Sequence, residues 1–177
     1  FGRTNITGDI TGDGVDDLLV GAPGNDEVAS SSGKLYLLTG TTSVLDVESN
    51  YIGYALGSNN YSYMGRVAEN LGDVDGSGSN SSAFGGYGTA LNYYGGALTV
   101  VNSSGSVATV INGDYYDYLG YNNRVAGAGD MDGDGYDDWV AAGCYSSSCN
   151  SISYSGKIWA FYGASSVSWT STSDADA

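Results

Sequence analysis

The chain has 177 residues, of which 41 % are hydrophobic, and it carries a formal net charge of −15 with no histidine. This apolar content excludes a disordered acidic tail, because such tails are too polar to build a core. A polyanion repels phosphate backbones and anionic lipids, so nucleic acid is excluded as a partner. No apolar run approaches the ~20 residues of a membrane span, which excludes membrane insertion by a helix.

The composition favours short strands joined by tight turns. Glycine is abundant (29 residues), proline nearly absent (1), and tyrosine (16) far outnumbers phenylalanine (3). No window sustains an apolar stripe with the 3.6-residue period of a helix. We therefore predict an all-β chain.

In chain order, the first unit opens on an acidic loop at 8–17, Gly-Asp-Ile-Thr-Gly-Asp-Gly-Val-Asp-Asp. The apolar runs 18–23 and 33–38 predict two strands joined by a hairpin, and 51–52 belongs to a further connecting strand. The second unit has an apolar run at 64–68 and a degraded loop at 72–81. Its later strands are predicted at 82–86, 96–101 and 109–111.

The third unit repeats the first closely. Its loop at 129–138 is Gly-Asp-Met-Asp-Gly-Asp-Gly-Tyr-Asp-Asp, preceded by the apolar run 124–128 and followed by 139–143 and 156–161. The first aspartates of the three loops are 64 and 57 residues apart. Four antiparallel strands in about 60 residues are typical of a β-propeller blade. The sequence therefore predicts three repeats, 1–60, 61–118 and 119–177, with the second degenerate. Each repeat is expected to form one four-stranded antiparallel sheet of an incomplete ring or of a larger repeat assembly.

The acidic loops are candidate calcium sites. Of 20 acidic residues, 11 lie in these loops, whereas adaptation to high salt would scatter them. Calcium takes six to eight oxygen ligands, and alternate residues of a curled loop can point inward together. Positions 1, 3, 5 and 9 would give side chains and position 7 its carbonyl. The predicted ligands are Asp9, Thr11, Asp13, Val15 and Asp17 in the first loop, and Asp130, Asp132, Asp134, Tyr136 and Asp138 in the third.

Two alternatives stay open for these loops. Asp and Gly favour turns in any case, so the loops could be turns without a metal. Magnesium is less suited than calcium, because it demands a stricter octahedron and retains its waters. The second loop keeps only two carboxylates, so a third calcium is doubtful. Its weak candidate ligands are Asp73, Asp75, Ser77, Ser79 and Ser81.

Cysteines and glycosylation motifs favour an oxidising compartment. Cys144 and Cys149 are close enough in sequence for a local disulfide, which we favour over two free thiols. Two thiols without a histidine disfavour zinc. Asn-x-Ser/Thr motifs, which also arise by chance in serine-rich sequence, make possible glycosylation sites of Asn5, Asn60, Asn80 and Asn102.

These residues together resemble a known repeat. The pair Phe1-Gly2, the acidic loop and the run 19–23, Leu-Val-Gly-Ala-Pro, are similar to the FG-GAP repeat of integrin α-subunit β-propellers. The resemblance covers nearly the whole chain. It implies seven-bladed propellers, an extracellular or cell-surface location, calcium in the blade loops and a role in adhesion or ligand binding. Three repeats cannot close such a ring, so we expect an excised segment that is completed by further repeats or other copies of the protein.

Three function classes are weighed. The leading hypothesis is a structural or adhesive calcium-binding module, such as a unit of a surface fibre or of a larger propeller. The alternative is a carbohydrate-binding, lectin-like propeller, in which tyrosines and tryptophans would stack on sugars, although aromatics in small sheets are more often core. An enzyme is not expected, because the clustered carboxylates are already assigned to metal and no nucleophile or cofactor motif is present. Protein or glycan ligands remain open as partners.

Overall fold

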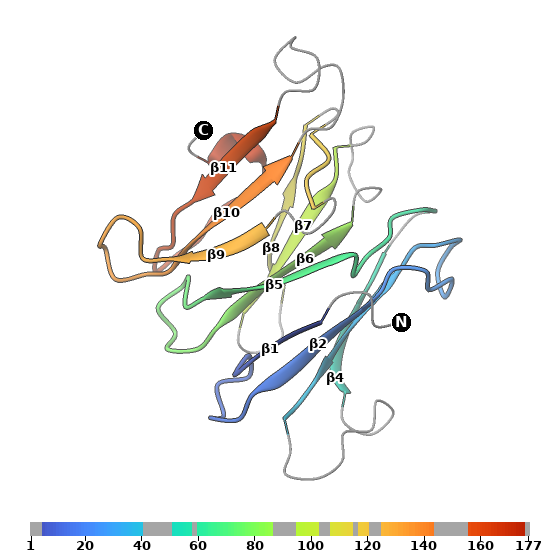
Figure 1. Cartoon of the computed structure of the whole chain (residues 1–177), viewed down its shortest axis with the longest axis horizontal. Helices are drawn as coiled ribbons and strands as arrows, with labels where there is room; N and C mark the ends of the chain where they lie inside the picture. Colours follow the sequence, from blue (N-terminus) through green and yellow to red (C-terminus); the bar gives the residue numbers. More distant parts are fainter. Residues whose placement is uncertain are drawn as a thin grey trace.

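The computed structural model describes residues 5–40, 51–57, 60–86, 95–102, 107–114, 117–120, 125–143 and 156–175. These residues form three antiparallel sheets, arranged as a fan with no closed ring among them (Figure 1). The only helix in these ranges is a short 3₁₀ turn at Thr172–Asp174. The prediction of an all-β chain built from blade-like sheets is confirmed.

The first two sheets, here called blade 1 and blade 2, each have four strands in sequence order, β1-β2-β3-β4 and β5-β6-β7-β8. The strands of blade 1 are β1 Asn5–Gly8, β2 Asp17–Ala22, β3 Lys34–Leu38 and β4 Tyr51–Leu56. The strands of blade 2 are β5 Val67–Gly72, β6 Ser81–Gly86, β7 Ala97–Val101 and β8 Val107–Asn112. The expected fourth strands are therefore present in both blades.

The third sheet, blade 3, has three strands in the described residues, in the order β11-β10-β9. They are β9 Val125–Gly129, β10 Asp138–Gly143 and β11 Lys157–Phe161. The segment that follows β11 does not add a fourth strand to this sheet. Instead Asn112, at the end of β8, donates its backbone N–H to the Thr170 carbonyl at 3.1 Å and forms a parallel bridge with Ser171.

The first strands of the three blades lie next to one another, with β5 in contact with both β1 and β9 (Figure 1). Blades 1 and 2 also meet through glycines. Gly33 forms a parallel bridge with Met64, and a Cβ at Gly21 would lie 1.9 Å from the Gly65 carbonyl oxygen. A side chain at residue 21 would therefore force the two blades apart.

The core lies between the blades, since each sheet buries apolar side chains against its neighbour. Between blades 1 and 2, alternate residues of a strand point into the core. Leu35 and Leu37 of β3 thus face Phe84 of β6. Between blades 2 and 3 the cluster contains Leu98 and Val100 of β7, opposite the aromatic residues of blade 3. Burial of both faces explains why all six residues of β6 are buried.

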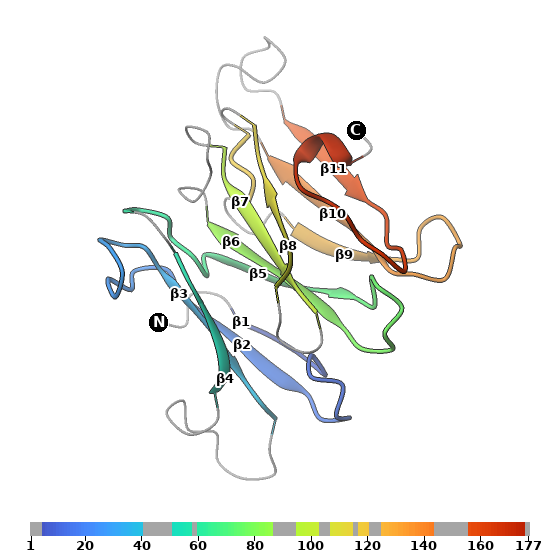
Figure 2. The ribbon, with the colours of Figure 1, turned by 180° about the vertical axis from the view of Figure 1, so that it is seen from behind.

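Three aromatic rings anchor the C-terminal segment on blade 3. Trp139 and Phe161 stack with centroids 4.1 Å apart, and Trp169 packs edge-on against them at 5.5 and 5.9 Å. Figure 2 shows this segment from behind, lying over β10 and β11. A capping box closes its 3₁₀ turn, in which Asp174 accepts hydrogen bonds from the backbone of Thr170 and Ser171. Trp169 thus packs on the face of blade 3 that carries Trp139 and Phe161.

No helix in the described ranges has the length and apolar character needed to cross a bilayer.

Replacing Trp169 with alanine tests whether the C-terminal segment is part of the core. The indole is 6 % exposed, and removing a buried aromatic ring costs about 3–5 kcal/mol of unfolding free energy. We expect Trp169→Ala to lower the urea midpoint accordingly. Tyr162→Ala, on a side chain that is 38 % exposed, should cost much less. Equal losses for the two variants would contradict the described packing.

Candidate functional site

The three acidic loops each connect the first and second strands of a blade, and they lie side by side at one end of the fan (Figure 1). Acidic loop 1 comprises residues 9–16, acidic loop 2 comprises 73–80 and acidic loop 3 comprises 130–137. Because each hairpin has the same length, the same loop position occupies the same place in each blade. The alignment inferred from the sequence is thus the alignment in space.

One hydrogen bond curls all three loops in the same way. The first aspartate accepts, through Oδ2, the backbone N–H of the glycine five residues later. The pairs are Asp9 and Gly14 at 2.9 Å, Asp73 and Gly78 at 2.9 Å, and Asp130 and Gly135 at 3.0 Å. Each of these glycines has a φ between +83° and +96°. This left-handed backbone strains residues with a Cβ, so glycine is required at this position.

Later carboxylates in the loops also accept local backbone N–H groups. Asp13 accepts from Val15 at 2.9 Å and Asp134 accepts from Tyr136 at 2.9 Å. These bonds are Asx turns, which hold an acidic side chain close to its own backbone. The loops are therefore ordered by their own carboxylates, and the remaining lone pairs of those carboxylates stay available.

Acidic loop 3 and the first residue of β10 bring three predicted ligands together. One carboxylate oxygen from each of Asp130, Asp132 and Asp138 lies within 4.8 Å of the other two. The pKa of Asp132 is raised from its ordinary value by desolvation and by repulsion from Asp134, Asp138 and Asp130, against a lowering by the Asp134 N–H. A hard cation with oxygen preference, such as calcium, would relieve that repulsion.

In each of the other two loops, one buried side-chain oxygen without a hydrogen-bond partner is compatible with a bound cation. The Thr11 hydroxyl in acidic loop 1 and Oδ1 of Asp73 in acidic loop 2 are buried and have no hydrogen-bond partner. Buried polar atoms rarely lack a partner in a finished structure. The donor set of the loops, which consists of carboxylate, hydroxyl and carbonyl oxygens, fits calcium in each case. Asp134 lies outside the three-carboxylate group of acidic loop 3.

Asp17 and Asp138, the first residues of β2 and β10, also have a structural role that the sequence interpretation missed. Asp138 is fully buried and accepts N–H groups on both oxygens, from Met131 at 2.6 Å and from Gly163 at 2.8 Å. Asp17 is bound in the same way by the N–H groups of Ile10, at 2.9 Å, and Gly40, at 2.8 Å. These residues tie each loop to the end of the third strand, and they would keep this tie without a metal.

Asp137, which precedes Asp138 in the sequence, links blades 2 and 3. Asp137 accepts the Asp73 N–H at 2.8 Å, and its own N–H donates to the Asp73 carbonyl at 3.1 Å. Asp137 had no predicted role. The sequence did contain a signal for such a role, namely two consecutive aspartates. Adjacent residues at the start of a strand point to opposite sides, so the two carboxylates cannot share one site.

Acidic loop 2 departs from the other two. The Ser77 hydroxyl donates to the Ser79 carbonyl at 3.3 Å, and Ser81 is buried at the start of β6. Asp73 and Asp75 are the two carboxylates among its five candidate ligands. The weaker expectation for this loop stays a prediction.

The remaining predicted features are unevenly placed. Cys144 and Cys149 lie outside the described residues, so their pairing stays a prediction. Asn5 is in β1, and Asn102 follows β7. Asn60 is exposed, with its side chain accepting the Ser30 N–H at 3.1 Å. Asn80 lies half-buried at the junction of blades 1 and 2.

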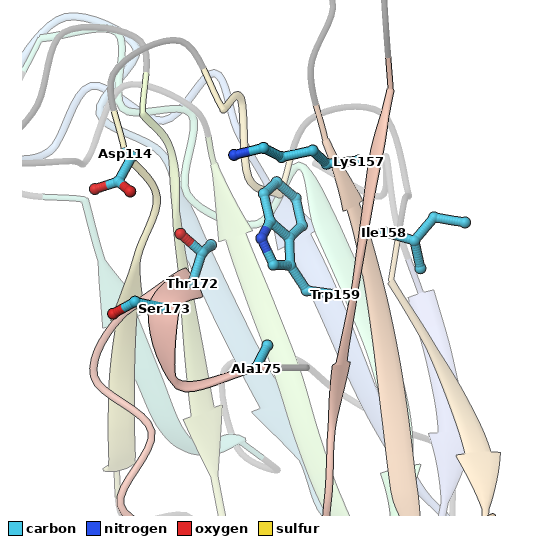
Figure 3. Close-up of a pocket in the computed structure, with 7 residues that line it drawn as sticks. All are labelled: Asp114, Lys157, Ile158, Trp159, Thr172, Ser173 and Ala175. Atoms are coloured by element: carbon cyan, nitrogen blue, oxygen red, sulfur yellow. The ribbon is translucent and has the colours of Figure 1, made fainter. Parts of the chain in front are cut away.

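A pocket at the other end of blade 3 bears on the carbohydrate alternative. It lies between β11 and the 3₁₀ turn (Figure 3). The Lys157 ammonium is 5.7 Å from the Trp159 ring centroid and 3.6 Å from the Asp117 carboxylate, which also accepts the Thr172 hydroxyl. Trp159 is 2 % exposed, and the other two tryptophans are also buried. No tryptophan therefore offers an open ring face on which a sugar could stack.

Comparison with known families identifies the repeat. Residues 1–38 match the family described as FG-GAP repeat. The matched segment contains Phe1-Gly2, acidic loop 1 and the strands β1 to β3, so the resemblance drawn from these residues is confirmed. FG-GAP repeats are blades of β-propellers, in agreement with the three sheets. No curated protein matches the chain closely enough to count as a relative.

Asp132→Asn tests the electrostatic state of acidic loop 3. Because the pKa of Asp132 is raised, its ionised form destabilises the metal-free fold above that pKa. Asparagine keeps the oxygen that accepts the Asp134 N–H and removes the charge. We expect the variant to melt higher than the parent in EDTA at neutral pH. The difference should shrink as pH falls through the raised pKa, where the parent gains stability by binding a proton. A lower melting temperature in EDTA would contradict the assignment, and Asp114→Asn, an exposed carboxylate outside the loops, is the control.

Asp138→Asn tests the structural tie. The amide NH₂ would face a backbone N–H in place of an accepting oxygen, which leaves a buried donor unsatisfied. We expect a loss of about 1–3 kcal/mol of unfolding free energy even in EDTA. Urea unfolding with and without calcium measures it. A loss seen only when calcium is present would show that Asp138 acts as a ligand alone.

Proposed function

We propose that this chain is a calcium-binding FG-GAP module of an extracellular, non-catalytic propeller-type protein with a structural or adhesive role. Two calcium ions are assigned, one to acidic loop 1 and one to acidic loop 3. The observation that carries the proposal is the convergence of Asp130, Asp132 and Asp138, whose oxygens lie within 4.8 Å of one another where acidic loop 3, curled by the Asp130 carboxylate, meets β10.

The residues that would hold calcium follow from the loop geometry. In acidic loop 3 these are the three converging carboxylates, supplemented by Asp134 and the Tyr136 carbonyl. Acidic loop 1 has the same curl, with Asp9 bound to the N–H groups of Asp13 and Gly14 at 3.0 and 2.9 Å. There the orphaned Thr11 hydroxyl supplies an oxygen in place of a carboxylate. Calcium would supply charge neutralisation and no covalent chemistry.

Calcium fits better than magnesium for a geometric reason. The loops offer carboxylate, hydroxyl and carbonyl oxygens from one short, curled segment of chain. Calcium accepts six to eight such ligands at variable angles, whereas magnesium requires a near-ideal octahedron and retains water. Selectivity for calcium is therefore part of the proposal.

The role assigned to the ion is to hold neighbouring blades at a fixed spacing. Acidic loop 3 contacts acidic loop 2 through Asp137 and Asp73. A cation that fixes the curl of one loop would therefore fix the position of the residue that bonds to the next blade. The same reasoning makes catalysis an unsuitable role for these carboxylates, because a filled ligand sphere leaves no open position.

Extracellular placement is supported by the repeat family and by two features of the sequence. FG-GAP repeats typically occur in extracellular proteins, where millimolar calcium is available. The closely spaced pair Cys144 and Cys149 suits an oxidising compartment. Asn60, the acceptor residue of a glycosylation motif, is exposed. Adhesion is the role that a rigid repeat of this kind serves best, with a protein or glycan as ligand.

Calcium titration with thermal melting tests the proposal. Free calcium at about 100 times the dissociation constant stabilises a site by about 2.7 kcal/mol. For a chain of this size each site should raise the melting temperature by roughly 5–10 °C. Calorimetry should give two ions per chain. Magnesium at the same concentration should stabilise much less.

Paired variants separate the two sites. Asp9→Asn with Asp13→Asn should remove one ion, and Asp130→Asn with Asp134→Asn should remove the other. Asp114→Asn, which alters charge outside the loops, should leave the stoichiometry at two. A protein whose melting temperature is the same in EDTA and in calcium would refute the calcium assignment and return the loops to ordinary turns.

A further inference from the structure

Five places in the chain have an aspartate or asparagine directly before a glycine. They are Asp13-Gly14, Asp75-Gly76, Asp132-Gly133 and Asp134-Gly135 in the acidic loops, and Asn112-Gly113 at the end of β8. In such a pair the backbone nitrogen of the glycine can attack the side-chain carbonyl carbon of the residue before it, because glycine has no Cβ to hinder the approach. All five pairs share this susceptibility, and the fold decides which of them can react.

Four of the five glycine N–H groups are held by hydrogen bonds. The donors and acceptors are Gly14 with the Asp9 carboxylate at 2.9 Å, Gly133 and Gly135 with the Asp130 carboxylate at 2.6 and 3.0 Å, and Gly113 with the Gly96 carbonyl at 3.0 Å. A nitrogen that donates to a fixed acceptor must break that bond before it can turn towards the preceding side chain, and breaking the bond costs free energy. These four pairs are therefore protected while the chain is folded.

The glycine of the fifth pair, Gly76 in acidic loop 2, lacks this protection. Among the residues that the structure describes, none accepts a hydrogen bond from its N–H. Acidic loop 3 shows which partner is missing, because there Oδ1 of the first aspartate, Asp130, accepts the N–H of the glycine three residues later. In acidic loop 2 the equivalent oxygen, Oδ1 of Asp73, is buried without a partner. The donor and its expected acceptor are thus both left unpaired in the same loop.

The Asp75 side chain is held beside the backbone nitrogen that would attack it. Its Oδ1 accepts the Ser77 N–H at 3.0 Å, which forms an Asx turn across Gly76. The aspartates of the other three Asp-Gly pairs form the same turn, so the position of the carboxylate does not distinguish the four. Asp75 is half-buried and Gly76 is exposed, so water reaches the pair. The distinguishing feature is the unbonded glycine N–H.

We propose that Asp75 is a site of spontaneous backbone modification, in which aspartate becomes isoaspartate. The Gly76 nitrogen bonds to Cγ of Asp75, and its proton leaves as water together with the hydroxyl of the protonated carboxyl group, which gives a cyclic succinimide. Water then adds to the main-chain carbonyl of the ring and breaks its bond to the nitrogen. The chain now runs through Cγ, and no oxidant or cofactor is consumed. This inference goes beyond calcium binding and does not require it.

The modification would disturb both junctions of blade 2, because acidic loop 2 lies between the other two acidic loops (Figure 1). Isoaspartate inserts one extra carbon atom into the main chain between Asp75 and Gly76. The Tyr136 ring of acidic loop 3 packs on Gly76, and the Ser79 side chain packs on Gly12 of acidic loop 1. A lengthened loop would displace both contacts. Modification at one residue would therefore loosen the packing of blade 2 on both of its neighbours.

Peptide mapping of the folded chain after prolonged incubation tests the proposal. The protein is kept below its melting temperature in EDTA, so that no cation covers the loop carboxylates and the result does not depend on the calcium assignment. Electron-transfer fragmentation then locates isoaspartate. We expect about tenfold or more at Asp75 than at Asp13, Asp132 or Asp134, because each of those pairs must first lose a hydrogen bond to a charged acceptor.

Incubation of the same chain in urea is the control for the fold. Unfolding removes every protecting hydrogen bond, so the four aspartates should then react at similar rates. Equal yields at the four aspartates in the folded chain would overturn the proposal. The same preference for Asp75 in urea would also overturn it, because the preference would then come from local sequence.

A variant that removes the protecting acceptor tests the cause. Asp130→Ala leaves the N–H groups of Gly133 and Gly135 without their carboxylate and should raise isoaspartate at Asp132 and Asp134 about tenfold. Melting curves verify that the variant is folded. Asp9→Ala makes the same test on Asp13-Gly14, should the first variant fail to fold. A folded variant whose exposed pairs stay unmodified would contradict the proposed protection.

Asp75→Glu tests the consequence for the blade junctions. Glutamate keeps the negative charge, but its longer side chain would have to close a six-membered ring, which forms much more slowly. Gly76 is unsuitable for substitution, because its φ is +70° and a Cβ there would lie 2.6 Å from the Tyr136 ring. After incubation the parent should melt at a lower temperature than before, whereas Asp75→Glu should not change. An equal fall in both proteins would show that modification of Asp75 does not loosen blade 2.

Discussion

A sheet of short strands has two faces and can bury each of them only against another sheet, and this constraint shapes the whole molecule. Among the three sheets of the described residues, blade 2 is the one with a neighbouring sheet on both sides, and β6 is accordingly buried along its entire length. The hydrophobic effect therefore acts between blades more than within them. Glycines such as Gly21 allow the close approach that this packing demands. The stability of any one blade depends on the presence of the next.

The acidic loops solve a second problem, which is how to hold these sheets in register at their ends. Each loop uses its own carboxylates to satisfy its backbone N–H groups, so the curl does not depend on distant residues. The cost is a concentration of negative charge, most evident in the raised pKa of Asp132. A bound cation would remove that cost without altering the hydrogen bonds. The hydrogen bonds that order a loop and the cation that would neutralise its charge thus contribute separately to the stability of the fold.

Local pattern was sufficient to predict the strands, the hairpins and the common geometry of the loops, because alternation and turn residues act over a few positions. It failed where a residue's partner lies far away in the chain. Asp137 and Asp138 look alike in sequence, yet one bonds to the neighbouring blade and the other to its own. Trp169 finds its ring partners through tertiary packing alone, so its segment could not be distinguished from a loop. The predicted fourth strand of blade 3 is absent from the described residues for the same reason.

The attachment of the C-terminal segment to β8 has a mechanical consequence. Tension applied at the C-terminus would be transmitted through the Asn112–Thr170 hydrogen bond to the edge of blade 2, and through Trp169 to the aromatic rings of blade 3. Two adjacent sheets would then share the load, because the pull reaches both before either can peel away.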